Sequence, residues 1–218
     1  VQALTGARKP LIITGSNAGS EAIIEAAANI AKALKGRGSD VGITFVAGAA
    51  NSMGLAMIGG GSLDQALEQL ASGAADTAIV MENDLYRHAP AAQVDAALAK
   101  VNNLIVADHQ RTAIMDKANL ILSSASFAES DGTLINQEGR AQRFFQVYDP
   151  AYYDDAKKNQ FTVMLESWRW MHSLHSTYTS RHVDWTQLDD VIAACVAALP
   201  QLQGIVDAAG DYVIGLGP

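Results

Sequence analysis

Residues 11–20 read L-I-I-T-G-S-N-A-G-S, and this stretch decides the fold. A short apolar run, residues 11–14, ends at a Gly-rich loop, and a helical pattern fills residues 21–35. Ser20 is the expected N-cap of that helix and Gly36 its expected stop. The stretch therefore predicts one strand–loop–helix unit.

The same unit recurs along the chain. Further strands are expected at 41–47, 77–81, 104–107 and 119–122, and helices at 62–73, 91–100 and 112–117. Ser62 and Gln65 have the spacing of a capping box at the start of the second helix. The strands are continuously apolar, which is typical of strands covered on both faces. Because strands that alternate with helices pair in parallel through right-handed crossovers, the order predicts an α/β fold. We expect a doubly wound, mainly parallel sheet with helices on both faces.

The character of the sequence changes after Pro150. Helices are expected at 154–176 and 183–199, and the tail 201–218 is Gly-rich. We therefore expect an α/β domain at 1–150 and, at 151–218, a C-terminal helical extension with a partly flexible tail.

Composition excludes several classes of protein. The net charge of −8 argues against a nucleic-acid surface. The single cysteine excludes a disulfide framework and an all-cysteine iron–sulfur cluster in these residues. No apolar run approaches the ~20 residues that a membrane span needs, and no signal peptide is recognisable at the start. The sequence begins at Val1 rather than Met, so we expect a fragment of a longer protein.

Residues 128–143 read A-E-S-D-G-T-L-I-N-Q-E-G-R-A-Q-R. Composition alone favours two surface turns, at Asp131-Gly132 and Glu138-Gly139, around a short strand. The pattern E-x-D-G-T-x-x-N-x-E-G-R-x-Q resembles the signature loop of the molybdopterin oxidoreductase superfamily. Its residues here are Glu129, Asp131, Gly132, Thr133, Asn136, Glu138, Gly139, Arg140 and Gln142. From side-chain chemistry we expect Arg140 to lock the loop by bidentate bonds to Glu129 or Asp131.

The superfamily includes formate dehydrogenases, nitrate reductases and the large iron–sulfur subunits of respiratory NADH:quinone oxidoreductase (complex I). The acidic and aromatic residues at 144–153 are most similar to the bacterial complex I branch, in its C-terminal half. The resemblance implies a scaffold domain with no catalytic residue, metal or cofactor of its own. It implies a parent on the cytoplasmic side of the inner membrane that passes electrons from NADH to quinone, coupled to proton translocation. The parent's 4Fe-4S and 2Fe-2S clusters would be bound upstream of Val1, and the partners would be other peripheral-arm subunits.

In open parallel sheets, ligands bind outside the carboxyl ends of the strands. In molybdoenzymes of the superfamily the matching loops help to bind the guanine dinucleotide part of the cofactor. The corresponding residues of a vestigial cofactor pocket here are Gly15, Ser16, Asn17, Asn51, Ser52, Asp108 and Thr112. The loop after residue 14 suits a phosphate but is not G-x-G-x-x-G and lacks the P-loop lysine. Asn119 and Ser123 stand where the superfamily usually has Asp and Pro, which argues against an intact cofactor site.

Two alternatives stay open: a cofactor-binding domain of a formate dehydrogenase-like molybdoenzyme, and a free-standing nucleotide-binding module. A metal at His172, His175 and His182 is disfavoured, because no carboxylate completes it. Cys195 lies in an apolar helical pattern and is expected to be a buried core residue. Acid–base chemistry is disfavoured at a strand-end cluster of four residues, Asp84, His88, Asp108 and His109.

Overall fold

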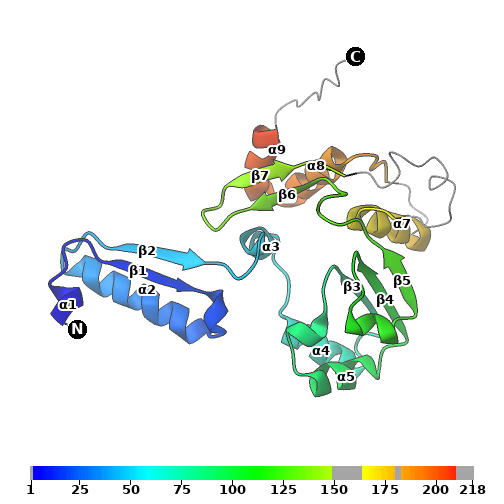
Figure 1. The fold of residues 1–218 in the computed structure, drawn as a ribbon, viewed down its shortest axis with the longest axis horizontal. Helices are drawn as coiled ribbons and strands as arrows, with labels where there is room; N and C mark the ends of the chain where they lie inside the picture. Colours follow the sequence, from blue (N-terminus) through cyan, green and yellow to red (C-terminus); the bar gives the residue numbers. More distant parts are fainter. Residues whose placement is uncertain (1, 149–163, 180–182, 210–218) are drawn as a thin grey trace, which may run out of the picture. The chain divides into compact units, whose positions relative to one another are not determined.

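The computed structural model describes residues 2–148, 164–179 and 183–209 (Figure 1). The chain divides into two compact units. The first holds Val1–Gly59 with Thr133–Gln142, and the second holds Gly60–Gly132 with Arg143–Pro218. Because residues 149–163 lie outside the described part, a domain boundary at residue 150 stays a prediction.

The first unit is built on one strand–helix–strand element. Strands β1 (Leu11–Gly15) and β2 (Gly42–Val46) pair in parallel, with Leu11 opposite Gly42. Helix α2 (Glu21–Gly36) connects them and packs on the strands, and its buried side chains are Ala27, Ala31 and Leu34. Ser20 is the N-cap, as predicted, but its side chain makes no capping hydrogen bond. The shorter elements are α1 (Gln2–Thr5), η1 (Ser16–Ala18) and α3 (Ser52–Ile58).

The second unit is built on three parallel strands. These are β3 (Thr77–Met81), β4 (Asn103–Asp108) and β5 (Leu120–Ser123), in the order β3–β4–β5. The elements around them are α4 (Leu63–Ser72), η2 (Leu85–Arg87), α5 (Ala91–Leu98) and η3 (Ala113–Lys117). The predicted capping box of α4 is confirmed. Ser62 Oγ accepts from the Gln65 amide at 3.2 Å, and Gln65 Oε1 accepts from the Ser62 amide at 3.0 Å.

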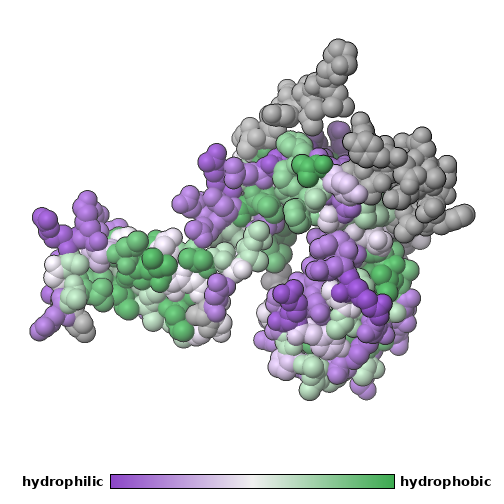
Figure 2. All heavy atoms as spheres, viewed as in Figure 1, coloured by the Kyte–Doolittle hydropathy of each residue, from purple (hydrophilic) through white to green (hydrophobic). Residues whose placement is uncertain are grey.

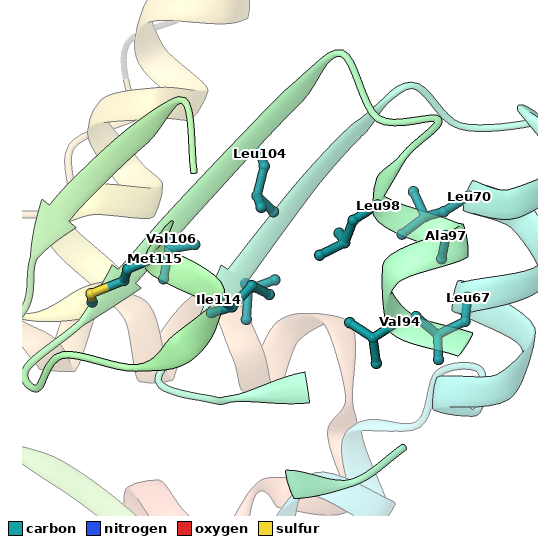
Figure 3. Close-up of a cluster of buried hydrophobic side chains, with 10 residues drawn as sticks. Leu67, Leu70, Val94, Ala97, Leu98, Leu104, Val106, Ile114 and Met115 are labelled. Carbon is teal, nitrogen blue, oxygen red and sulfur yellow. The ribbon is translucent and has the colours of Figure 1, made fainter. Parts of the chain in front are cut away.

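The core of the second unit lies between the sheet and helices α4 and α5 (Figure 3). Leu67 from α4 and Val94 from α5 meet Leu104 and Val106 from β4, and Ile114 from η3 completes the layer. Each is at most 2% exposed. Full burial of such a side chain stabilises the folded state by roughly 1.5–3 kcal/mol, so this cluster is the main source of stability in the unit.

The C-terminal part of the chain contains a hairpin and, after it, helices. Strands β6 (Gly132–Ile135) and β7 (Ala141–Phe144) form a two-stranded sheet. Helices α7 (Ser167–Thr179) and α8 (Leu188–Ala198) follow, and then η4 (Pro200–Leu202) and α9 (Gly204–Ala209). Residues 210–218 of the tail lie outside the described part.

The α/β class, the parallel strands flanked by helices and the helical C-terminal region are confirmed. Within the described ranges the parallel strands belong to two sheets, β1–β2 and β3–β4–β5. The prediction of a helix beginning at residue 154 was wrong for Met164 and Leu165, because Leu165 forms a parallel bridge with Ser124 and the helix begins only at Ser167. Residues 154–163 of that predicted helix lie outside the described part. Across the described residues, no helix is both long and apolar enough to span a membrane.

Candidate functional site

The loop after β1 is fastened to the loop after β2. Ser16 Oγ accepts a hydrogen bond from the Gly48 amide at 3.1 Å. Gly15 has no room for a side chain, since an added Cβ would lie 2.1 Å from the Val46 carbonyl oxygen. A Cβ on Gly48 would lie 2.7 Å from Asn17 Oδ1. The structure therefore brings the predicted residues Gly15, Ser16 and Asn17 to the carboxyl end of β2.

Asn51 and Ser52 form the turn that leads into α3. Asn51 is left-handed, with φ of 63°, and its Oδ1 accepts from the Ile135 amide at 2.9 Å. Asn51 thus bonds a residue 84 positions away and makes no side-chain cap for its own helix. Ser52 Oγ donates to the Ala49 carbonyl at 2.8 Å and accepts from the Ala49 amide at 3.2 Å. The Asn51 side chain therefore holds the turn to residue 135, and the Ser52 side chain holds it to residue 49.

Strands β6 and β7, residues 132–144, carry most of the signature residues, and we call them the signature hairpin. One side chain closes its tip. Asn136 Oδ1 accepts from the Glu138 amide at 3.0 Å and from the Arg140 amide at 2.9 Å. Gly139 takes φ of 80°, as the turn signal predicted, and its amide donates to the Asn136 carbonyl at 3.0 Å. Left-handed backbone costs glycine little, which explains the residue type. The side chains of Glu138 and Arg140 are exposed at this tip.

The remaining signature residues hold the base of the hairpin. Glu129 Oε2 accepts from the Ser126 amide and hydroxyl at 2.9 and 2.7 Å, and Asp131 Oδ1 accepts from the Gln146 amide at 2.6 Å. Two more positions are close-packed. A Cβ on Gly132 would lie 2.3 Å from the Phe144 ring, and Thr133 Oγ1 is buried with no hydrogen-bond partner among the described residues. The side chain of Gln142 is exposed on β7.

The expected ion pair of Arg140 stays a prediction. Both candidate carboxylates, Glu129 and Asp131, are held by neighbours within the second unit. Arg140 belongs to the first unit, where its backbone closes the hairpin turn.

A polar pocket of about 510 Å³ opens in the first unit. Two segments line it, residues 47–53 after β2 and residues 135–138 of the hairpin. Asn51, Ser52, Asn136 and Glu138 are the predicted residues that it brings together. The size is that of a small-molecule site. The sequence did not predict that the signature hairpin would form one wall, because that contact joins segments more than 80 residues apart.

Asp108 and Thr112 belong to the second unit, and their sharing a site with Asn51 stays a prediction. Asp108 is 4% exposed at the end of β4, and its Oδ1 accepts from the Gln110 amide at 3.1 Å and lies 3.3 Å from His109 Nδ1. Thr112 precedes η3, and its buried Oγ1 has no hydrogen-bond partner in the part of the chain that the structure describes. Asp84 caps η2 by accepting from the Tyr86 amide at 3.2 Å.

Two of the three histidines weighed as metal ligands, His172 and His175, lie on α7, and Cys195 lies on α8. His172 Nε2 lies 2.6 Å from the Val183 carbonyl oxygen, and its ring packs against Trp185. His182 lies outside the described residues, and the described ones contain no cluster of His, Cys, Asp or Glu fit to hold a metal. The expectation of a buried Cys195 was wrong. The residue is half-buried, because the buried position on α8 is the next one, Val196.

The superfamily's dinucleotide cofactor carries a pyrophosphate, so its pocket needs free donors or cations. The only charged residue that lines the pocket in the described structure is Glu138, a carboxylate. The described lining therefore offers no cation to a pyrophosphate, and its carboxylate repels phosphate. The charge of the pocket does not favour an anionic dinucleotide.

Comparison with known proteins identifies relatives of this sequence. The model of the molybdopterin oxidoreductase family matches residues 1–159, well over half of the chain. The G subunit of the NADH-quinone oxidoreductase of Yersinia pestis is 82% identical over 212 residues, which are 97% of this chain. The subunit of the same name is 68% identical in Escherichia coli strain K12 (97% of this chain) and 56% identical in Pseudomonas putida (95%). The chain spans only 23% of the length of the first two relatives and 22% of the third. By the match over residues 1–159, this chain belongs to the molybdopterin oxidoreductase family.

Proposed function

We propose that this chain is part of the large subunit, of G type, of a bacterial NADH-quinone oxidoreductase. The observation that carries the proposal is the 82% identity to a protein of that name over 97% of the chain. The whole subunit would take part in passing electrons from NADH through iron–sulfur clusters to quinone. It would act at the cytoplasmic side of the inner membrane, among the other peripheral-arm subunits of a proton-translocating complex.

Within that subunit these residues act as a scaffold. Cys195 is the only cysteine in the sequence, and iron–sulfur clusters are held by several protein ligands, most of them cysteines. The 4Fe-4S and 2Fe-2S clusters are therefore bound by residues outside this stretch. Ser16 Oγ and Asn51 Oδ1 each connect two separate loops, and Asn136 Oδ1 closes its own hairpin turn. These bonds support a structural role for the loops that would bind the cofactor in molybdoenzymes.

The alternative is a working cofactor domain of a formate dehydrogenase-like molybdoenzyme. The family match favours it, and the lining of the pocket argues against it. In that case a pterin dinucleotide would contact the loops after β1 and β2. No catalytic step is assigned to the residues of this chain under either proposal.

The deciding experiment is metal and pterin analysis of the full-length parent, purified from cells able to make molybdopterin. We expect iron without molybdenum, tungsten or pterin. Stoichiometric molybdenum and pterin would overturn the scaffold proposal and support the alternative. As a control, a molybdoenzyme purified from the same cells must carry its pterin.

A further inference from the structure

A row of large aliphatic side chains crosses the second unit's sheet. The parallel register places Ile79 beside Ile105, and Ile105 beside Leu120. Because side chains alternate along a strand, these three point away from the face that carries Val80 and Val106 into the core. Ile79 is 48% exposed, Leu120 is 43% exposed and Ile105 is half-buried. Figure 2 shows apolar side chains, in green, at the surface over β5.

The same face is covered at the carboxyl end of the strands, where α7 packs. Trp170 Nε1 donates to the Ser123 carbonyl at 2.8 Å, and Ser167 Oγ donates to the Glu82 carboxylate. In the next row of the register, Ala107 is fully buried and Leu122 is 9% exposed. The open aliphatic row is therefore continuous with a packed helix–sheet interface.

Helix α7 reaches the ends of both outer strands, through Glu82 after β3 and Ser123 of β5. It does not cover the whole face, because Met81 of β3 is 49% exposed in addition to Ile79. Parallel sheets occur almost only with both faces covered, and an exposed contiguous apolar patch marks an interface.

We infer that an amphipathic helix from the rest of the longer polypeptide packs beside α7 on the row Ile79–Ile105–Leu120. The inference rests on the proposed function, in which this chain is one part of a G-type subunit. The shared stretch is only 23% of the Yersinia pestis relative, so most of such a polypeptide lies outside these residues. A segment of the same polypeptide is present at high effective concentration, which favours it over a separate partner.

Cysteine labelling tests the inference. Ile79→Cys and Leu120→Cys are made separately in a Cys195→Ala background, in the 218-residue chain and in the isolated full-length subunit. Glu68→Cys, on the exposed side of α4, is the accessible control, and Ala97→Cys, fully buried in α5, reports that the unit is folded. Labelling is followed site by site by peptide mass spectrometry, so that any other cysteines of the longer polypeptide do not contribute. Two separate sites are used so that one poorly folding variant does not decide the result.

In the 218-residue chain we expect the cysteines introduced at positions 79 and 120 to label about as fast as the one at position 68, with position 97 protected. In the isolated full-length subunit we expect labelling at positions 79 and 120 to slow by on the order of ten-fold or more, with position 68 unchanged.

Equal labelling rates at positions 79, 120 and 68 in the full-length subunit would overturn the inference. Slow labelling at positions 79 and 120 already in the 218-residue chain would also overturn it, because these residues themselves or a second copy of the chain would then cover the row. Protection that develops only in the assembled complex would overturn it too, and would identify a partner subunit as the cover instead. The readout needs no metal analysis, so it can fail while the proposed function stands.

Discussion

Asn51 Oδ1 accepts a hydrogen bond from the Ile135 amide at 2.9 Å, across 84 residues of sequence. Ile135 is 5% exposed, so its amide has little access to water. The bond fastens the turn before α3 to the signature hairpin, and both segments line the pocket. The pocket's shape therefore depends on an amide side chain held in a left-handed backbone.

Replacing Asn51 by Ala is expected to destabilise the chain by roughly 1–3 kcal/mol, because the buried Ile135 amide loses its acceptor. The left-handed φ of 63° adds to the loss, since alanine tolerates that conformation less well than asparagine. The measurement is the midpoint of urea unfolding. Asn51→Asp keeps an oxygen at the same position and is the matched control. Equal losses in the two variants would contradict the role assigned to the hydrogen bond.

The effect of Gly54→Ala on stability is expected to depend on the side chain at position 51. A Cβ at Gly54 would lie 2.1 Å from Asn51 Oδ1, so Gly54→Ala should push the Asn51 side chain off Ile135 and destabilise the chain. In an Asn51→Ala background the clash is absent, and Gly54→Ala should instead stabilise by about 0.5–1 kcal/mol through helix propensity. A double-mutant cycle measures this reversal of sign. Gly36→Ala at the end of α2, where nothing lies within 4 Å of an added Cβ, is the control. Additive effects of the two substitutions would refute the coupling.

The sequence carried enough local information to place most elements. The capping box of Ser62 and Gln65 predicted the start of α4, and the glycine of the E-G-R motif predicted a left-handed turn at Gly139. Such features are set by residues a few positions apart. Helix α3 was missed because its sequence, S-M-G-L-A-M-I, lies in a Gly-rich stretch without a recognisable helical period.

The pocket was predictable only in part. The strand-end rule identified Asn51 and Ser52, and the superfamily pattern identified Asn136 and Glu138. The contact between these two groups depends on tertiary packing, for which no local pattern exists. The division of the parallel strands between two sheets was likewise invisible, because every apolar run looks alike whichever neighbour it pairs with.

Asn119 is expected to tie β5 to β4. Its Oδ1 accepts from the Leu104 amide at 2.7 Å, and its own amide donates to the Leu104 carbonyl at 2.8 Å. Leu104 is 2% exposed, so Asn119→Ala should leave a buried donor unpaired and cost roughly 1–3 kcal/mol. Asn119→Asp, the residue usual in the superfamily, keeps the acceptor and should cost much less. The urea midpoints of the two variants measure the difference. If Asn119→Asp loses more stability than Asn119→Ala, the side-chain oxygen is not what holds the strand.

Asp190 is expected to make the stability of the chain sensitive to acid. Hydrogen bonds from the backbone amides of Thr186 and Gln187 lower the pKa of Asp190 below the usual range of an aspartate. A carboxyl whose pKa is lower in the folded state stabilises the fold above its unfolded pKa, near ~3.9. That contribution is lost as the pH falls through the folded pKa.

Asp190→Asn should therefore lower the urea midpoint at pH 7 relative to the unsubstituted chain. This difference in midpoint should disappear as the pH falls below about 4. Unfolding curves for both chains between about pH 7 and about pH 2.5 measure the difference, provided that both remain cooperatively folded. Glu68→Gln is the control and should leave the midpoint nearly unchanged, because Glu68 is an exposed carboxylate on α4. If the difference in urea midpoint between Asp190→Asn and the unsubstituted chain does not change with pH, the charge of Asp190 does not stabilise the start of α8.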